Sequence, residues 1–264
     1  MAETETDQAR LDLENKAVQE ATSRYEDLVT SLILIATSSR SRKEKMALIS
    51  EQKKKMLEFN NEFSKKQTEL FYGKFTDEAF NEAKTLEPSI GSKKKLSFGQ
   101  DQELKSLSEE LKLGLNKRLD TLINEAERLT VKEELVRIRE EKIGLKAGSE
   151  KTQITPTKSK KDLPFTNSKG QRVKMNAVMK LTVGDPVWNA SIASQRSEWV
   201  RLGFRYVQHI SVLDDKTTLL CRGLHKTRRD LLSDPLPPMH IGCRSKVKLL
   251  KEGWNEATFL KNFK

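Results

Sequence analysis

The hydrophobic positions of the first 37 residues recur at helical spacing and predict one long amphipathic helix. Leu11, Val18, Tyr25 and Leu32 follow one another at intervals of seven residues. Such a heptad pattern places them in one stripe along a helix, as in a coiled coil. We therefore expect a helix over residues 7–37. A second position of the same seam is filled by Ala21, Leu28 and Ile35.

Two further stretches of the N-terminal part carry a helical pattern. Residues 41–72 combine a lysine-rich face with apolar positions, and a short helix is expected over residues 75–86 before Pro88 ends it. After a loop at residues 88–98, a leucine stripe predicts a third long helix that runs to about Leu145, where Gly144 and Gly148 close it. The stripe consists of Leu104, Leu107, Leu111, Leu115, Leu119, Leu122, Ala126 and Leu129.

The pattern changes in the last third of the chain. Residues 149–171 are polar and contain prolines, a composition typical of a linker. Beyond them, Tyr206, Gln208 and Ile210 alternate with Val207 and His209, which predicts a half-buried strand. A helix is expected over residues 192–202, a closing strand over 245–250, and either a strand or a short helix over 173–183.

These patterns predict an α+β protein made of two unlike parts. Residues 1–148 form a helical, coiled-coil-like domain, 149–171 a linker, and 172–264 a small α+β module. Long helices with narrow apolar stripes must pack on one another or on neighbouring subunits. The helices therefore form either an intramolecular bundle or an extended hairpin docked on a partner. The apolar run at residues 31–37 is too short to cross a membrane.

Charge is divided between the same two parts. Residues 149–264 hold 22 Lys and Arg against 10 Asp and Glu, or +12, whereas residues 1–148 hold 27 against 28, or −1. A basic excess of this kind attracts the phosphates of nucleic acids without reading sequence. Each cluster is equally compatible with a solvated face or an acidic protein partner. The candidate DNA contacts are Lys158, Lys160, Lys161, Arg222, Lys226, Arg228, Arg229, Arg244, Lys246 and Lys248.

All histidines and cysteines of the chain fall between residues 209 and 243, where any soft-metal or thiol site must lie. Cys221, His225, His240 and Cys243 offer two thiolates and two imidazoles, a set that suits tetrahedral zinc. The alternatives are a packed pair of small apolar cysteines beside a hydrogen-bonded histidine, or a disulfide, which requires an oxidising compartment.

A thiol nucleophile, Cys221 with His240 as its base, is the weakest interpretation because no sequence motif marks an oxyanion hole. The chain also lacks a glycine-rich phosphate loop, a Gly-x-Ser-x-Gly elbow and a His-Glu-x-x-His helix. The absence of these motifs favours a structural or binding protein over an enzyme.

The segment Pro237-Pro-Met-His-Ile-Gly-Cys-Arg244 resembles a motif of the phage Mu F-type minor head proteins, also called phage head morphogenesis proteins. The resemblance covers roughly residues 185–250 and includes the strand at Tyr206-Val207, residues 213–217 with Cys221, and Leu224-His225. Three positions depart from the family pattern. Thr218 and Ser245 stand where cysteines are expected, and Lys226 replaces a glycine.

The resemblance implies a minor capsid protein of a tailed phage, present in several copies near the portal vertex. Its expected partners are the portal and major capsid proteins and packaged double-stranded DNA, in head assembly or in genome packaging and ejection. The chain would be made in the host cytoplasm, without a signal peptide or membrane anchor, before it enters the virion. The alternatives are a basic nucleic-acid-binding protein outside the virion, and an enzyme or toxin built on the same module. If Cys221, His240 and Cys243 bind zinc, the expected fourth ligand is His225, Asp214 or Asp215.

Overall fold

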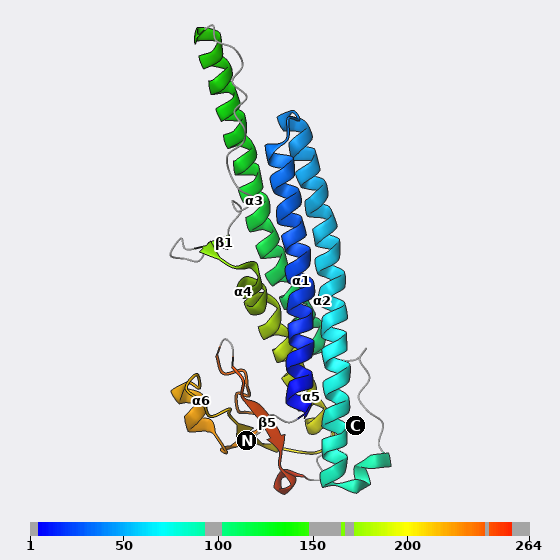
Figure 1. The fold of residues 1–264 in the computed structure, drawn as a ribbon. Helices are drawn as coiled ribbons and strands as arrows, with labels where there is room; N and C mark the ends of the chain where they lie inside the picture. Colours follow the sequence, from blue (N-terminus) through cyan, green and yellow to red (C-terminus); the bar gives the residue numbers. More distant parts are fainter. Residues whose placement is uncertain (1–4, 93–101, 148–164, 167–171, 241–242, 255–264) are drawn as a thin grey trace. The chain divides into compact units, whose positions relative to one another are not determined.

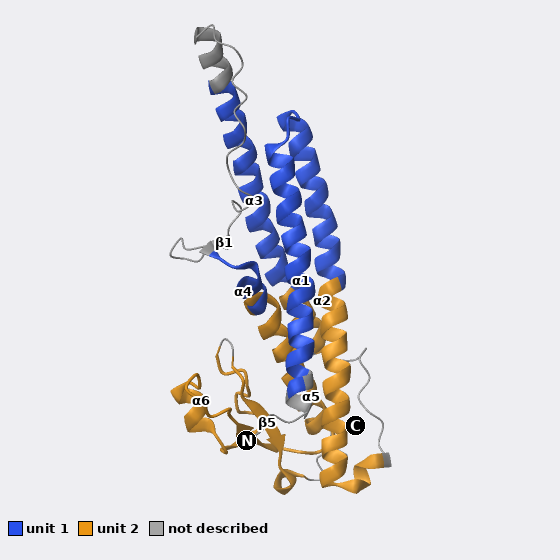
Figure 2. Ribbon diagram, viewed as in Figure 1, with its two compact units in different colours: residues 1–62, 112–180 blue, residues 63–111, 181–264 orange. Residues whose placement is uncertain are grey.

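The chain adopts an α+β fold in which helices predominate, as predicted. The computed structural model describes residues 5–92, 102–147, 165–166, 172–240 and 243–254 (Figure 1). It divides into two compact units, one of residues 1–62 and 112–180 and the other of residues 63–111 and 181–264 (Figure 2). Each unit therefore combines segments from both sides of the predicted linker. That linker lies outside the described residues except at 165–166, so the predicted domain boundaries stay a prediction.

Three helical segments pack side by side in the first unit: α1 (Glu5–Thr37), residues 42–62 of α2 (Arg42–Leu86) and residues 112–147 of α3 (Gln102–Ala147) (Figure 1). The heptad seam of α1 is buried from Val18 to Ile35, with Tyr25 and Leu32 fully inaccessible. The Tyr25 hydroxyl lies 2.7 Å from the carbonyl oxygen of Leu115 and 3.2 Å from Asn60 Oδ1. Asn60 in turn donates to Asn116 Oδ1 at 2.9 Å. This unit is an intramolecular bundle.

The turn between α1 and α2 is fixed by a capping box. Ser41 Oγ accepts from the backbone N–H of Glu44 at 3.4 Å, and Glu44 Oε2 accepts from the backbone N–H of Ser41 at 2.9 Å. These reciprocal bonds satisfy donors at the start of α2 that have no partner within the helix. Two short strands, β1 (Phe165–Thr166) and β2 (Arg172–Val173), and the short helix α4 (Met175–Met179) also belong to this unit.

The helix boundaries correct one expectation. Residues 41–72 and 75–86 form one helix, α2, because the buried Phe71, Phe75 and Ala79 continue its apolar stripe across Gly73. A single glycine costs a helix only about 1 kcal/mol, so this packing overrides it. The third helix, α3, passes Gly144 and runs to Ala147, close to its predicted end near Leu145. Pro88 does end α2, and the short 3-10 helix η1 (Pro88–Ser92) follows.

The second unit contains a three-stranded antiparallel sheet in the order β4-β3-β5. Its strands are β4 (Arg228–Asp230), β3 (Tyr206–Ile210) and β5 (Lys246–Leu249). The predicted alternation of β3 is confirmed, since Val207 and His209 are buried. The π-helical segment η3 (Lys180–Gly184) leads into α5 (Asp185–Arg201), which covers the predicted helix.

The core of the second unit joins its two chain segments. Trp199 on α5 is fully buried, and its indole N–H donates to the carbonyl oxygen of Ala79 on α2 at 3.1 Å. The short 3-10 helix η4 (Lys251–Gly253) lies against β3, where the backbone N–H of Arg205 donates to the Gly253 carbonyl oxygen. A Cβ at Gly253 would stand 2.7 Å from the backbone nitrogen of Tyr206, so this close approach requires glycine.

None of the helices within the described residues has an apolar stretch long enough to cross a membrane.

Candidate metal centre

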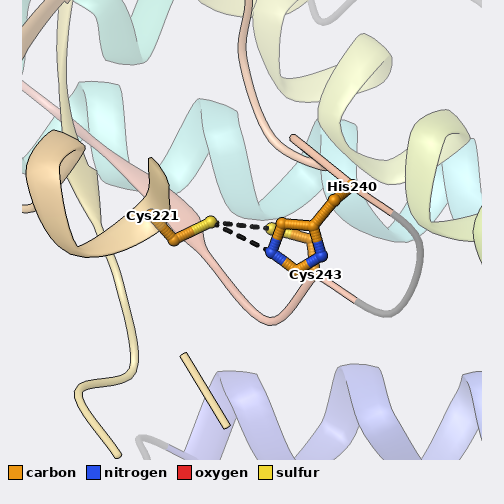
Figure 3. Close-up of side chains that lie close together, drawn as sticks. All are labelled: Cys221, His240 and Cys243. Atoms are coloured by element: carbon orange, nitrogen blue, oxygen red, sulfur yellow. Dashed lines mark hydrogen bonds between the residues drawn. The ribbon is translucent and has the colours of Figure 1, made fainter. Parts of the chain in front are cut away.

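Three of the four predicted metal ligands come together in the second unit. Cys221, His240 and Cys243 each offer a ligand atom, and these atoms lie within 4.8 Å of one another (Figure 3). Cys221 Sγ is 3.2 Å from His240 Nε2 and 3.7 Å from Cys243 Sγ. Both cysteines are buried and free, and the imidazole is partly exposed. The prediction that these three side chains cluster is confirmed.

The distance between the two sulfurs suits a tetrahedral ion, and the distance from Cys221 to His240 lies close to the required value. Zinc–sulfur bonds of about 2.3 Å at tetrahedral angles put two sulfurs about 3.8 Å apart, and a sulfur and an imidazole nitrogen about 3.6 Å apart. The observed sulfur–sulfur distance of 3.7 Å matches the first value. The sulfur–nitrogen distance of 3.2 Å is that of a thiol–imidazole hydrogen bond, and it needs only a small opening to admit an ion.

Cys221 is held by the short helix α6 (Leu219–Leu224). The Thr218 hydroxyl caps this helix by accepting from the backbone N–H of Cys221 at 3.3 Å. The carbonyl oxygen of Cys221 accepts from Ser211 Oγ at 2.5 Å. Thr218, which stands where the family pattern has a cysteine, therefore has a structural role at the start of the helix.

Ser211 connects the two segments that carry the cluster. Its hydroxyl contacts Cys221 on one side and lies 3.3 Å from the Ser245 hydroxyl on the other, and both serines are buried. Ser245, the second departure from the family pattern, directly precedes β5 and is two residues from Cys243. No pattern in the sequence indicated this role of Ser211.

His240 and Cys243 are linked by a backbone hydrogen bond. The backbone N–H of Cys243 donates to the His240 carbonyl oxygen at 3.0 Å, which holds the two residues close together. Gly242, which we expected to permit a tight turn, lies outside the described residues. The strand β5 begins three residues after Cys243, as the expected return of the chain requires.

The expected fourth ligands lie elsewhere. His225 stands at the end of α6, where its Nδ1 accepts from the backbone N–H of Ser211 at 3.1 Å. Asp214 Oδ1 accepts from Arg244 Nη2 at 2.7 Å, and this ion pair together with the Thr217 hydroxyl holds the pKa of Asp214 well below its usual range. Among the described residues, neither His225, Asp214 nor Asp215 completes the group formed by the three clustered side chains.

All four predicted DNA-binding arginines have partners within the unit. Arg222 donates to the carbonyl oxygens of Asp214 and Thr217, and Arg244 pairs with Asp214. The remaining pairs are Arg228 with Glu252 and with the ring of Tyr206, and Arg229 with Asp234 and the carbonyl oxygen of Pro235.

The predicted lysines differ from the arginines in their exposure. Lys226 and Lys248 are exposed, and Lys246 is partly exposed. Lys158, Lys160 and Lys161 lie outside the described residues.

His209 is a buried histidine that was not among the predicted metal ligands. It is fully inaccessible on β3, and neither ring nitrogen has a hydrogen-bond partner in the described part of the chain. Burial, with Arg229 and His225 nearby, lowers the pKa of His209. Val247 lies opposite it on β5. Its environment is that of a neutral core residue, and it does not join the cluster formed by Cys221, His240 and Cys243.

Comparisons of the chain with protein-family models, with curated proteins and with solved structures give no match. The cluster provides two thiols and one imidazole in a largely buried setting, and this donor set selects soft or borderline metal ions such as zinc.

Proposed function

We propose that this chain is a minor head protein of a tailed phage, with a structural rather than a catalytic role. The observation that supports the proposal is the convergence of Cys221 with His240 and Cys243, which lie 19 and 22 residues further along the chain. These residues carry the resemblance to the Mu F-type proteins. Their convergence supports a local architecture shared with the Mu F-type proteins. If the sequence match were due to chance, these distant positions would not be expected to meet in space.

The proposed place of the protein is the portal end of the head, in several copies per particle. The helical bundle would contact the portal or the major capsid protein, and the basic C-terminal part would face the packaged DNA. The +12 balance of residues 149–264 supports this second contact. The contact would be made to phosphates, because the chain has no motif for reading bases.

The placement is tested by a mass-spectrometric inventory of purified particles from the phage that encodes this chain. We expect the protein in low copy number, and we expect it to co-purify with the portal when heads are disrupted. The main rival is a basic nucleic-acid-binding protein that acts outside the virion, which the +12 balance also favours. Absence of the chain from intact particles would reject the head assignment and leave this rival.

The DNA contact is tested separately on the full chain. Double-stranded DNA of unrelated sequences should bind with equal affinity, and binding should weaken steeply as salt rises. Charge reversal of the exposed Lys226 and Lys248 to Glu should reduce the slope of log affinity against log salt by about 1 for each phosphate that the variant no longer neutralises. Lys53→Glu and Lys55→Glu, on the helical bundle, provide a control with the same charge change. Equal decreases in affinity for the two pairs would show that DNA does not bind through the basic part.

A further inference from the structure

We propose that Cys221, His240 and Cys243 form a zinc site with three protein ligands and a fourth position filled by solvent. This inference is independent of the head assignment, because it rests on the cluster geometry alone. The two sulfurs are already at the separation that two thiolates on one zinc ion require. The His240 nitrogen that faces them is Nε2, a common ligand atom for this metal.

The partner groups around the ligands favour a built site over an accidental contact. Ser211 Oγ donates to the Cys221 carbonyl oxygen and lies beside Ser245 Oγ, so one buried pair of hydroxyls supports both ligand segments. Thr218 fixes the backbone N–H of Cys221 from the other side. Outer groups of this kind orient metal ligands and strengthen binding.

A packed remnant without metal explains the same residues less well. A remnant needs only small apolar groups, and a valine or alanine would fill such a place without a polar neighbour. Here an imidazole nitrogen is directed at one thiol while the second thiol lies in contact with the first (Figure 3). Three potential ligand atoms gathered in this way can bind a metal ion, whereas their packing alone contributes little to stability.

The fourth ligand distinguishes this site from a closed structural site. His225 Nδ1 is occupied by the backbone N–H of Ser211, and Asp214 is held by Arg244. Since His240 is partly exposed, water reaches the ion on that side. Three protein ligands with a water in the fourth position form an open zinc site.

Zinc binding is measured on the full chain, purified under reducing conditions, stripped with a chelator and then titrated with zinc. We expect about one zinc per chain, and we expect bound zinc to protect both thiols from dithionitrobenzoate. Cobalt in place of zinc should give the sulfur charge-transfer band and intense visible bands of a four-coordinate thiolate site. If reduced, folded wild-type protein binds neither metal, the proposal is wrong.

Variants assign the ligands. Cys221→Ser, Cys243→Ser and His240→Asn should each weaken zinc binding by more than the roughly 10–100-fold that loss of an outer partner costs. Ser211→Ala should fall within that range. His225→Asn is the matched control, because it removes a nearby imidazole but keeps an acceptor for the Ser211 N–H, and it should bind zinc as the wild type does.

Helical circular dichroism confirms that each variant is folded. If a ligand variant does not fold, the metal and thiol measurements on the wild-type protein still decide the proposal. Loss of zinc in His225→Asn together with its retention in His240→Asn would overturn the assignment of ligands.

Discussion

The carboxylate of Glu82 on α2 accepts a hydrogen bond from the backbone N–H of Leu249 on β5, at 3.0 Å. The two residues are 167 positions apart, and both belong to the second unit. Since β5 is an edge strand of the sheet formed by the described residues, its outer N–H groups have no neighbouring strand there to bond. Glu82 satisfies one of them and ties the sheet to the helix.

Glu82→Ala should destabilise the protein by roughly 1–3 kcal/mol, because the buried N–H of Leu249 loses its acceptor. Glu82→Gln keeps an acceptor and should cost far less. Burial raises the pKa of Glu82 above 4.5. The protonation of Glu82 therefore stabilises the folded wild type at acidic pH, and this stabilisation is lost as the pH rises through the raised pKa. Urea unfolding of the three proteins on both sides of this range measures both effects. Equal costs for Ala and Gln would contradict the role of the hydrogen bond.

The ion pair between Asp214 and Arg244 fastens the loop before α6 to the segment that follows Cys243. The pKa of Asp214 lies below its ordinary 3.8, chiefly through this pair. Its contribution to stability is therefore complete above that pH and is lost as the pH falls toward the lowered pKa. Asp214→Asn should make the free energy of unfolding depend less on pH below 3.8. The same change at the adjacent, exposed Asp215 provides the control. A change in Asp215→Asn as large as in Asp214→Asn would show that the effect is unspecific.

His209 should make the second unit sensitive to mild acid. Its pKa is lowered by burial, by Arg229 and by His225, so the unfolded chain takes up a proton at about pH 6.5 that the folded protein resists. The associated stability is present above that pH and falls as the pH drops through 6.5 toward the lowered value. His209→Leu should flatten the dependence of unfolding free energy on pH between about pH 5 and pH 7. Metal-free protein is used throughout, and an unchanged slope would reject the assignment.

Tyr25 tests the packing of the helical bundle. Its buried hydroxyl lies within hydrogen-bond distance of Leu115 and Asn60, and burial raises its pKa, so the phenol stays protonated at all ordinary pH values. Tyr25→Phe keeps the ring but leaves the Leu115 carbonyl oxygen without this donor, at a cost of about 1–3 kcal/mol. Thermal unfolding followed by circular dichroism measures it. A cost below about 0.5 kcal/mol would mean that water replaces the hydroxyl there.

Periodic patterns predicted the long elements well, because burial of one face decides both the sequence and the structure. The seam through Tyr25 and the alternation of β3 are examples. Short elements were missed where tertiary contacts decide the backbone. β4 consists of Arg228, Arg229 and Asp230, which show no apolar alternation and form a strand only by pairing with β3.

The candidate site was predicted as a set of residues but without its geometry. The chemistry of cysteine and histidine identified Cys221, His240 and Cys243, yet His225 is as plausible a ligand on residue type alone. Its exclusion depends on a backbone N–H fourteen residues earlier, that of Ser211. The basic arginines present the same difficulty, since their acidic and carbonyl partners are set by the fold.

The division of the chain into interleaved units has a consequence for its synthesis. Trp199 and Ala79 meet in the core of the second unit although 120 residues separate them. At about 5–20 residues per second, a ribosome needs roughly 6–24 s to make that interval. During this time the buried apolar segment of α2 around Ala79 remains without Trp199 of α5, and it is exposed to aggregation or to chaperones. A fragment that begins at the linker would lack residues 63–111 and could not complete this core at all.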